Sequence, residues 1–278
     1  MEKKQNTFFI FVFLLMTLFG TLVAIIMMFS LFGVFSSQKL YTSDNIPEAD
    51  IGVSNKNIIL GETSDYGQEY IDRIIFLGES TTYGLQSYGV LKDGVNTTQV
   101  WTGATTKYGK TVSAGTMSLS PAIVNTKIFF PDTQTAMTIK EALEIKNPEY
   151  LIITLGLNNG ASYYSEKEFK YCYRLLLDTI RETSKDTTII LQSLFPVSKS
   201  CTIKAYTPQR LATCNEWLYD IAREYDLRYL NTSEALSDTD GYLKDNFDNG
   251  GDGIHLNKEG LLTVIEYIKR HGVPEEKQ

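Results

Sequence analysis

Short apolar runs alternate with amphipathic segments from about residue 71 to the end of the chain. Four runs are almost continuously apolar, which is typical of strands buried on both faces of a sheet. The first two stop directly before a Gly, the third shortly precedes Pro196, and the fourth is weaker. They are residues 73–77, 150–155, 188–194 and 227–230.

Between and after these runs, apolar residues recur at helical spacing. The segments are residues 138–146, 165–183, 208–225 and 258–270. Ser165 and Glu168 form a capping-box pattern at the start of the second segment. Strands that alternate with helices predict an α/β fold with a parallel sheet, because parallel neighbours need crossover connections. Such sheets bind ligands at the carboxyl ends of their strands, where we expect the chemistry.

Two other stretches after residue 35 are less regular. Residues 36–70 are rich in Ser, Asn, Asp, Gly and Glu, which predicts a linker or stalk. Residues 86–137 show only two apolar runs, 98–102 and 127–130. We therefore expect a single domain over residues 71–278.

Residues 8–35 differ from everything that follows, because these 28 positions contain no charge and are dominated by Phe, Leu, Ile, Val and Met. As a helix they would extend about 42 Å, at about 1.5 Å per residue, which exceeds a hydrocarbon core of about 30 Å. A cleaved signal peptide is the alternative, but its apolar region is shorter and ends in small residues. The pattern predicts one uncleaved transmembrane helix.

The charges that flank this segment predict its orientation. Lys3 and Lys4 precede it and only Lys39 follows closely, so the positive-inside rule favours a cytoplasmic tail at residues 1–7. The domain is then expected outside the cell membrane, as an extracytoplasmic part of a single-pass protein.

Composition excludes some partners. The net charge of -7 and the absence of a Lys/Arg cluster argue against nucleic acid, whose phosphates need clustered cations. Three cysteines do not form a disulfide framework. Cys201 and Cys214 are a candidate pair, although three ordinary thiols are the simpler interpretation.

Candidate chemistry centres on two short segments. His255 lies in a loop rich in Gly, Asn and Asp, and Asp252 stands three positions earlier, where it can accept from one ring nitrogen. Ser80 follows the first predicted strand directly and so lies at the carboxyl edge of the sheet. The ordinary alternatives are a turn histidine and a helix N-cap serine. The other histidine, His271, is expected at the surface in the last turn of the final helix.

Taken in order, three motifs resemble the blocks of SGNH hydrolases, also called GDSL-type esterases. They are Gly78-Glu-Ser80, Gly156-Leu-Asn158 and Asp252-Gly-Ile-His255, and the resemblance covers about residues 71–272. It implies a three-layer αβα, flavodoxin-like fold.

The resemblance also implies catalytic roles. Ser80 would be the nucleophile, His255 its base and Asp252 the group that orients the histidine. Asn158 would complete an oxyanion hole with the Ser80 backbone N–H and a glycine N–H, for which Gly115 is our choice. Together these residues would fill each role that acyl transfer through a serine requires.

At three positions the resemblance leaves a choice of residue or departs from the pattern of the family. Gly103 is the second candidate for the oxyanion glycine. Glu79 stands where the family usually has Asp, at a position that we expect to shape the turn without chemistry. Asn159 replaces a usual Asp, which puts the local support of its loop in question.

Two segments resemble a cofactor-binding or metal-binding motif, but each departs from the spacing or the residues that the motif requires. Residues 103–111 resemble a phosphate-binding loop but have five residues between the glycines, where the pattern needs four. Residues 248–253 with Glu259 resemble a calcium loop but have Gly250 at a ligand position. A catalytic zinc would need several His or Cys ligands. We therefore expect neither a metal nor a cofactor.

Tyrosine is frequent, with 17 residues, and four lie near the motif blocks in sequence. Such rings can stack on sugars, but most fill half-buried positions, which is the interpretation that we favour here. The four are Tyr83, Tyr88, Tyr163 and Tyr164.

These observations predict a membrane-anchored serine esterase that removes a small acyl group, such as acetyl, from a cell-envelope glycan or another small ester. Two alternatives remain open. An O-acyltransferase would use the same acyl-enzyme and pass the acyl group to a sugar, and a membrane acyltransferase is a candidate partner. A catalytically silent domain could instead bind glycan or assemble with a membrane partner.

Overall fold

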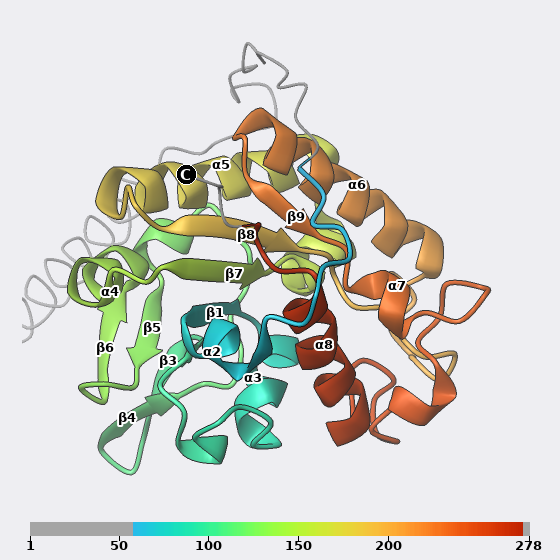
Figure 1. Ribbon diagram of the computed structural model, residues 1–278, viewed down its shortest axis with the longest axis horizontal. Helices are drawn as coiled ribbons and strands as arrows, with labels where there is room; N and C mark the ends of the chain where they lie inside the picture. Colours follow the sequence, from blue (N-terminus) through green and yellow to red (C-terminus); the bar gives the residue numbers. More distant parts are fainter. Residues whose placement is uncertain (1–57, 275–278) are drawn as a thin grey trace, which may run out of the picture. The chain divides into compact units, whose positions relative to one another are not determined.

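The computed structural model describes residues 58–274, which build a five-stranded parallel sheet flanked by helices on both faces (Figure 1). The strand order is β2-β1-β7-β8-β9, and each neighbouring pair is parallel. Counting only these strands along the chain gives the order 2-1-3-4-5 of flavodoxin-like folds. The strands are β1 (Ile74–Gly78), β2 (Val100–Trp101), β7 (Tyr150–Thr154), β8 (Thr188–Gln192) and β9 (Arg228–Leu230). The predicted α/β fold with a parallel sheet is confirmed.

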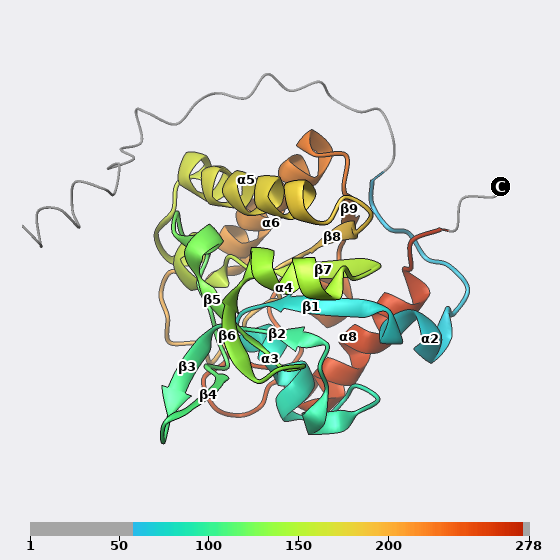
Figure 2. The same ribbon diagram turned by 90° about the vertical axis from the view of Figure 1, so that its left-hand side faces the viewer.

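Alternate strand residues supply two separate cores, one on each face of the sheet. One core packs under α4 (Ile139–Lys146), α5 (Glu166–Thr183) and α6 (Pro208–Glu224). The other packs under α2 (Gly67–Asp72), α3 (Ser80–Ser87) and α8 (Lys258–Arg270). Figures 1 and 2 show helices on both faces of the sheet. The short helix α7 (Ser233–Leu236) contacts α8. Helix, sheet and helix therefore form three layers.

Helix starts follow the side chains that cap them. Ser165 and Glu168 make both hydrogen bonds of the predicted capping box at α5. Thr138 and Glu141 form a second capping box at α4, and the Asn257 side chain caps α8. The four predicted helices agree with α4, α5, α6 and α8 within one residue at each end.

The irregular stretch from residue 86 to 137 contains two hairpins that contact each other. They are β3 (Ala104–Lys107) with β4 (Lys110–Ser113), and β5 (Lys127–Phe130) with β6 (Thr135–Thr138). The first hairpin starts and ends beside Gly103, which accepts a hydrogen bond from the backbone N–H of Ala114. The hairpin therefore leads directly into the segment that holds Gly115.

The linker predicted over residues 36–70 is too long at its C-terminal end. Ile58 and Leu60 are buried, and the Leu60 N–H donates to the Tyr229 carbonyl at 2.9 Å beside β9. Residues 67–70 belong to α2. The sequence did not indicate this segment, because residues 58–60 are only three apolar positions within a polar stretch. The domain thus includes residues from at least 58 onward.

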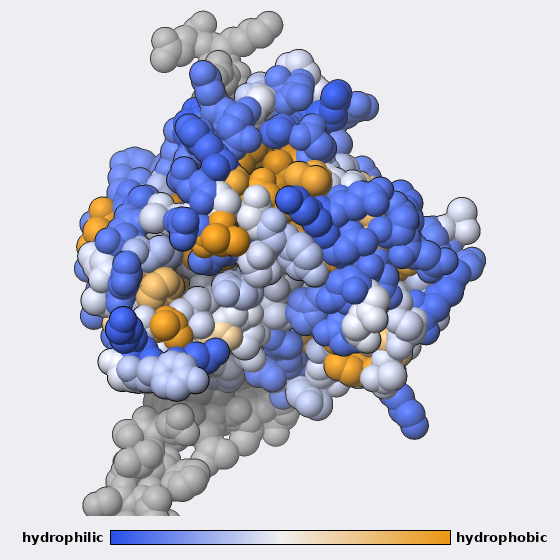
Figure 3. Space-filling model, turned by 90° about the horizontal axis from the view of Figure 1, so that it is seen from below, coloured by the Kyte–Doolittle hydropathy of each residue, from blue (hydrophilic) through white to orange (hydrophobic). Residues whose placement is uncertain are grey.

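The predicted transmembrane helix at 8–35 and the tail at 1–7 lie outside the described residues. Within residues 58–274, no helix combines the length and apolarity that a membrane crossing needs. The face drawn in Figure 3 is mainly hydrophilic, with small apolar patches between polar side chains.

All three cysteines are free thiols, so Cys201 and Cys214 do not pair.

Candidate active site

Ser80 lies at a tight turn between β1 and α3. A Cβ atom on Gly78 would lie 2.0 Å from Thr82 Oγ1 and 2.6 Å from the Thr154 carbonyl oxygen, so only glycine fits there. Helix α3 begins at Ser80 itself, and its N-cap residue is Glu79. Ser80 is therefore not the ordinary N-cap serine considered as an alternative, and it stands at the carboxyl end of a central strand.

His255 and Asp252 form a hydrogen-bonded pair in the loop before α8. The His255 Nδ1 donates to Asp252 Oδ2 at 2.6 Å. Asp252 Oδ1 accepts from the backbone N–H groups of Ile254 at 2.9 Å and His255 at 3.1 Å. Partial burial opposes ionisation of Asp252, but these hydrogen bonds outweigh it and hold its pKa below the usual value. An ionised Asp252 fixes the proton on Nδ1 and leaves Nε2 able to accept one.

Ser80 and His255 line one cavity of about 160 Å³, between α3 and the loop before α8. Among the described residues, neither the Ser80 hydroxyl nor His255 Nε2 has a hydrogen-bond partner, so both are available to a ligand. The structure thus brings together the predicted nucleophile, base and orienting carboxylate, although Ser80 lies more than 170 positions before Asp252 and His255 in the sequence. Their catalytic roles are taken up under the proposed function.

The predicted oxyanion donors lie on neighbouring segments and are engaged within the protein. Asn158 Nδ2 donates to Thr116 Oγ1 and to the Met117 carbonyl, both at 3.0 Å. The Gly115 N–H donates to Ser113 Oγ at 2.9 Å. An oxyanion would have to replace the hydroxyl groups of Thr116 and Ser113 as acceptors.

Of the two candidate glycines, Gly115 contacts a residue of the cavity that contains Ser80. A Cβ atom on Gly115 would lie 3.2 Å from the Tyr83 ring, and Tyr83 lines the cavity that contains Ser80. The Gly103 N–H is committed to the backbone carbonyl of Thr116 at 3.0 Å. A hydroxyl partner is more easily exchanged than a backbone carbonyl, which favours Gly115 again.

Glu79 has a larger part in the site than its position in the sequence suggested. Its side chain is 1% exposed and crosses to the loop after β7, where it accepts from the Leu157 N–H at 2.8 Å and the Asn158 N–H at 2.7 Å. Burial raises its pKa from 4.5 to about 8, although the backbone donors of Asn158, Leu157 and Gly156 favour the ionised form. Our expectation that Glu79 only shapes the turn is wrong, because it also positions the backbone of Asn158.

Other side chains hold the same loop. Arg210 donates to the carbonyls of Ala161 at 2.9 Å, Gly160 at 2.8 Å and Tyr164 at 2.6 Å. Asn159 Nδ2 donates to the Leu119 carbonyl at 3.1 Å. The loop is therefore supported even though Asn159 replaces the usual Asp. Sequence gave no signal for Arg210, which belongs to α6.

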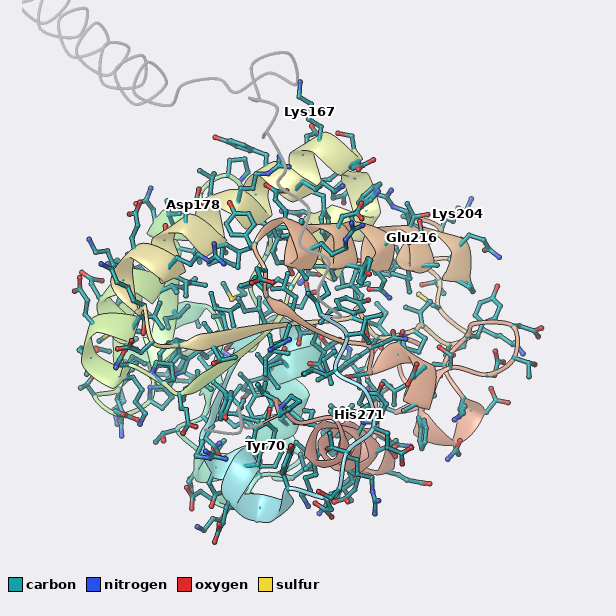
Figure 4. The ribbon with its side chains drawn as sticks, turned by 45° about the horizontal axis from the view of Figure 1, so that its top comes forward. Tyr70, Lys167, Asp178, Lys204, Glu216 and His271 are labelled. Carbon is teal, nitrogen blue, oxygen red and sulfur yellow. The ribbon has the colours of Figure 1, made fainter. Side chains whose placement is uncertain are left out.

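Residues outside this cluster have other partners. His271 lies at the C-terminal end of α8 (Figure 4). Its ring stacks on Tyr267, and its Nδ1 lies 2.8 Å from the Tyr267 carbonyl oxygen. Within the calcium-like segment, Glu259 accepts from Asn246 at 3.1 Å and Asp248 accepts from Ser200 at 3.2 Å. In residues 58–274, no three His, Cys, Asp or Glu side chains are grouped to hold a metal ion.

Solved structures similar to this chain are known. Among solved structures, the chain is similar to a proposed platelet activating factor from Streptococcus pneumonia, with a TM-score of 0.50, 16% identity, and coverage of 71% of this chain and 82% of that one. It is also similar to a proposed acylhydrolase from Bacteroides fragilis, with a TM-score of 0.42, 13% identity, and coverage of 83% and 91%. A GDSL-like lipase from Bacteroides thetaiotaomicron gives a TM-score of 0.40, 13% identity, and coverage of 72% and 87%. At 16% identity, the likeness to the first of these structures concerns the fold alone.

A search of curated protein sequences finds no match. A family model described as GDSL-like Lipase/Acylhydrolase family matches residues 76–261, which is more than half of the 278 residues and includes Ser80, Asn158 and His255. The chain therefore belongs to the GDSL-like lipase/acylhydrolase family, the SGNH hydrolases, and is a serine hydrolase of the esterase type.

Proposed function

We propose that this protein uses Ser80 to remove a small acyl group, such as acetyl, from a glycan of the cell envelope. One observation carries the catalytic part of this proposal. His255, with Nδ1 bonded to Asp252 at 2.6 Å, lines the same small cavity as Ser80, and its Nε2 is free of protein partners among residues 58–274. A base with a fixed tautomer next to an unpaired serine hydroxyl is what acyl transfer needs.

The mechanism follows from these positions. His255 Nε2 takes the Ser80 proton as Oγ attacks the ester carbonyl, and Asp252 stabilises the imidazolium that forms. The new oxyanion accepts from Asn158 Nδ2, the Gly115 N–H and the Ser80 N–H at the start of α3. The intermediate collapses as His255 returns the proton to the leaving alcohol. Water then repeats the sequence on the acyl-enzyme and releases the acid.

The solvent exposure of the site favours hydrolysis of the acyl-enzyme over transfer of its acyl group to a sugar. The side chains of His255 and Asp252 are 32% and 47% exposed, so water can reach the acyl-enzyme without a lid movement. Glycan as substrate is supported by the absence of a lipase-like apolar lid segment from the sequence after residue 71. An enzyme that removes acyl groups also needs a counterpart that adds them, and a membrane acyltransferase is the partner that we propose.

Location is a separate part of the proposal. Residues 8–35 would anchor the protein, residues 1–7 would lie in the cytoplasm and the hydrolase domain would lie outside. Protease added to intact cells should then digest the domain. Protection in intact cells, with digestion after the cells are broken, would refute this orientation.

The esterase activity can be tested with full-length protein in detergent. Wild type should release acetate from p-nitrophenyl acetate and from O-acetylated cell-wall glycan, and Ser80→Ala should release none. Acetate that appears on an added glycan instead of in solution would favour the acyltransferase. If folded wild type turns over neither substrate, the silent binding domain becomes the better hypothesis.

A further inference from the structure

The cavity beside Ser80 extends along one face of α3. Ser80, Tyr83, Gly84 and Ser87 have the i, i+3, i+4, i+7 spacing of one helix face, and all four line the cavity together with Tyr88. From Ser80 to Tyr88 the helix rises about 12 Å, at about 1.5 Å per residue. The cavity thus leads from the nucleophile to a tyrosine at the far end of the helix.

The opposite side is formed by the loop before α8 and by α8 itself, through Asn249, His255, Leu256 and Leu261. Gly84 allows this close approach, because a Cβ atom there would lie 3.2 Å from both δ carbons of Leu261. Part of the cavity lining is apolar, because it is formed by Gly84, Leu256 and Leu261.

Several polar groups around this apolar part are unpaired. Among the described residues, the hydroxyls of Tyr83 and Tyr88 and the Asn249 Nδ2 have no hydrogen-bond partner, and Tyr88 is 39% exposed. Tyr164 differs, because its hydroxyl donates to the Leu119 carbonyl at 3.1 Å. Aromatic rings and unpaired polar groups beside an apolar floor suit a pyranose, which has apolar ring faces and a rim of hydroxyls.

The lining also indicates which half of an ester would lie there. The cavity includes His255 but neither Asn158 nor Gly115. During breakdown of the intermediate, His255 Nε2 must reach the oxygen of the leaving alcohol, whereas the oxyanion turns to the other side. The cavity therefore adjoins the alcohol side of the ester.

We propose that this cavity, with Tyr88 and Tyr83 as its aromatic walls, is the subsite that holds the sugar ring carrying the ester oxygen. This inference rests on the proposed esterase function and adds the residues that would select a sugar alcohol. Under this proposal Tyr88 is a specificity residue, in contrast to the interpretation of these tyrosines as residues that fill half-buried positions.

Kinetics on two acetate esters that differ only in the alcohol test the subsite. Methyl 6-O-acetyl-glucopyranoside offers a sugar ring, and ethyl acetate offers only two carbons. Tyr88→Ala should lower kcat/KM for the sugar ester about three- to tenfold more than for ethyl acetate, through KM, as expected for one aromatic contact. Tyr88→Phe keeps the ring and should lose less. Tyr163→Ala is the matched control, because Tyr163 is 80% exposed and does not line the cavity.

Two kinetic results would overturn the subsite while the esterase function stands. One is an equal loss on both esters in Tyr88→Ala. The other is a changed preference of Tyr88→Ala among p-nitrophenyl acetate, butanoate and hexanoate, which would make the cavity an acyl site. Binding of methyl glucopyranoside, measured by titration calorimetry, tests the subsite without turnover. It should weaken in Tyr88→Ala and not in Tyr163→Ala, and an equal affinity in both variants would also overturn the proposal.

Discussion

Replacing Glu79 by Gln should change how the stability of the domain depends on pH. The carboxyl group has an ordinary pKa of 4.5 in the unfolded chain and a pKa of about 8 in the folded protein, where it is buried. Below pH 4.5 both states hold the proton. Between pH 4.5 and about 8, the carboxyl group has lost its proton in the unfolded chain but keeps it in the folded protein. The free energy of unfolding therefore falls as pH rises through this range.

The size of the effect follows from the two pKa values. The interval from 4.5 to about 8, at about 1.4 kcal/mol per pH unit, corresponds to about 5 kcal/mol of unfolding free energy lost across that window. Gln cannot ionise, so this part of the pH dependence should disappear. Gln also has only one acceptor oxygen for the N–H groups of Leu157 and Asn158, and the unpaired donor should cost about 1–3 kcal/mol.

Urea unfolding at pH 5, 6, 7 and 8 measures both effects. Glu79→Gln should be less stable than wild type at pH 5, and the difference should shrink or reverse by pH 8. Glu182→Gln, at an exposed position near the end of α5, is the matched control and should follow wild type at every pH. If Glu79→Gln keeps the full pH dependence of wild type, Glu79 does not titrate in this range and the reasoning fails.

Three further predictions concern turnover of p-nitrophenyl acetate. His255→Ala should lower kcat by about 10³-fold or more, because Ser80 loses its base. The control variant His271→Ala should match wild type. Similar rates in the two variants would exclude His255 as the base. Asn158→Ala removes one oxyanion donor and should lower kcat by about 10²- to 10³-fold with a smaller change in KM, so an unchanged kcat would remove Asn158 from the oxyanion hole. Prolonged dialysis against EDTA should leave the rate unchanged, and a loss that Ca²⁺ or Zn²⁺ restores would instead support a metal site in the loop at residues 248–259.

The regular part of the fold could be predicted because its signals are local. Continuous apolar runs gave the main strands, and the 3.6-residue period with caps such as Ser165 gave the helices. Of the two hairpins, only β5 had a signal in the sequence, the apolar run at 127–130. The pairing of the hairpin strands could not be predicted, since β3, for example, consists of Ala, Thr and Lys and has little apolar alternation. Residues 58–60 were missed because three apolar residues within a polar segment carry too little periodicity.

For the site, motif order was enough to select Ser80, Asp252 and His255, and the Asp252–His255 spacing alone predicted their hydrogen bond. The role of Glu79 was not visible, because its partner Leu157 lies 78 positions away in the sequence. The internal partners of Asn158 were also missed, since they depend on how the hairpin segment around Thr116 packs against the loop after β7.

Labelling with a fluorophosphonate probe tests the central claim most directly, because the probe reacts only with an activated serine. Full-length wild type should be modified on Ser80, as located by mass spectrometry of the digested protein. Ser80→Ala should remain unlabelled, and labelling of folded His255→Ala should be strongly slowed. Modification of a different serine, or labelling of His255→Ala at the wild-type rate, would contradict the assignment of Ser80 and His255 as nucleophile and base.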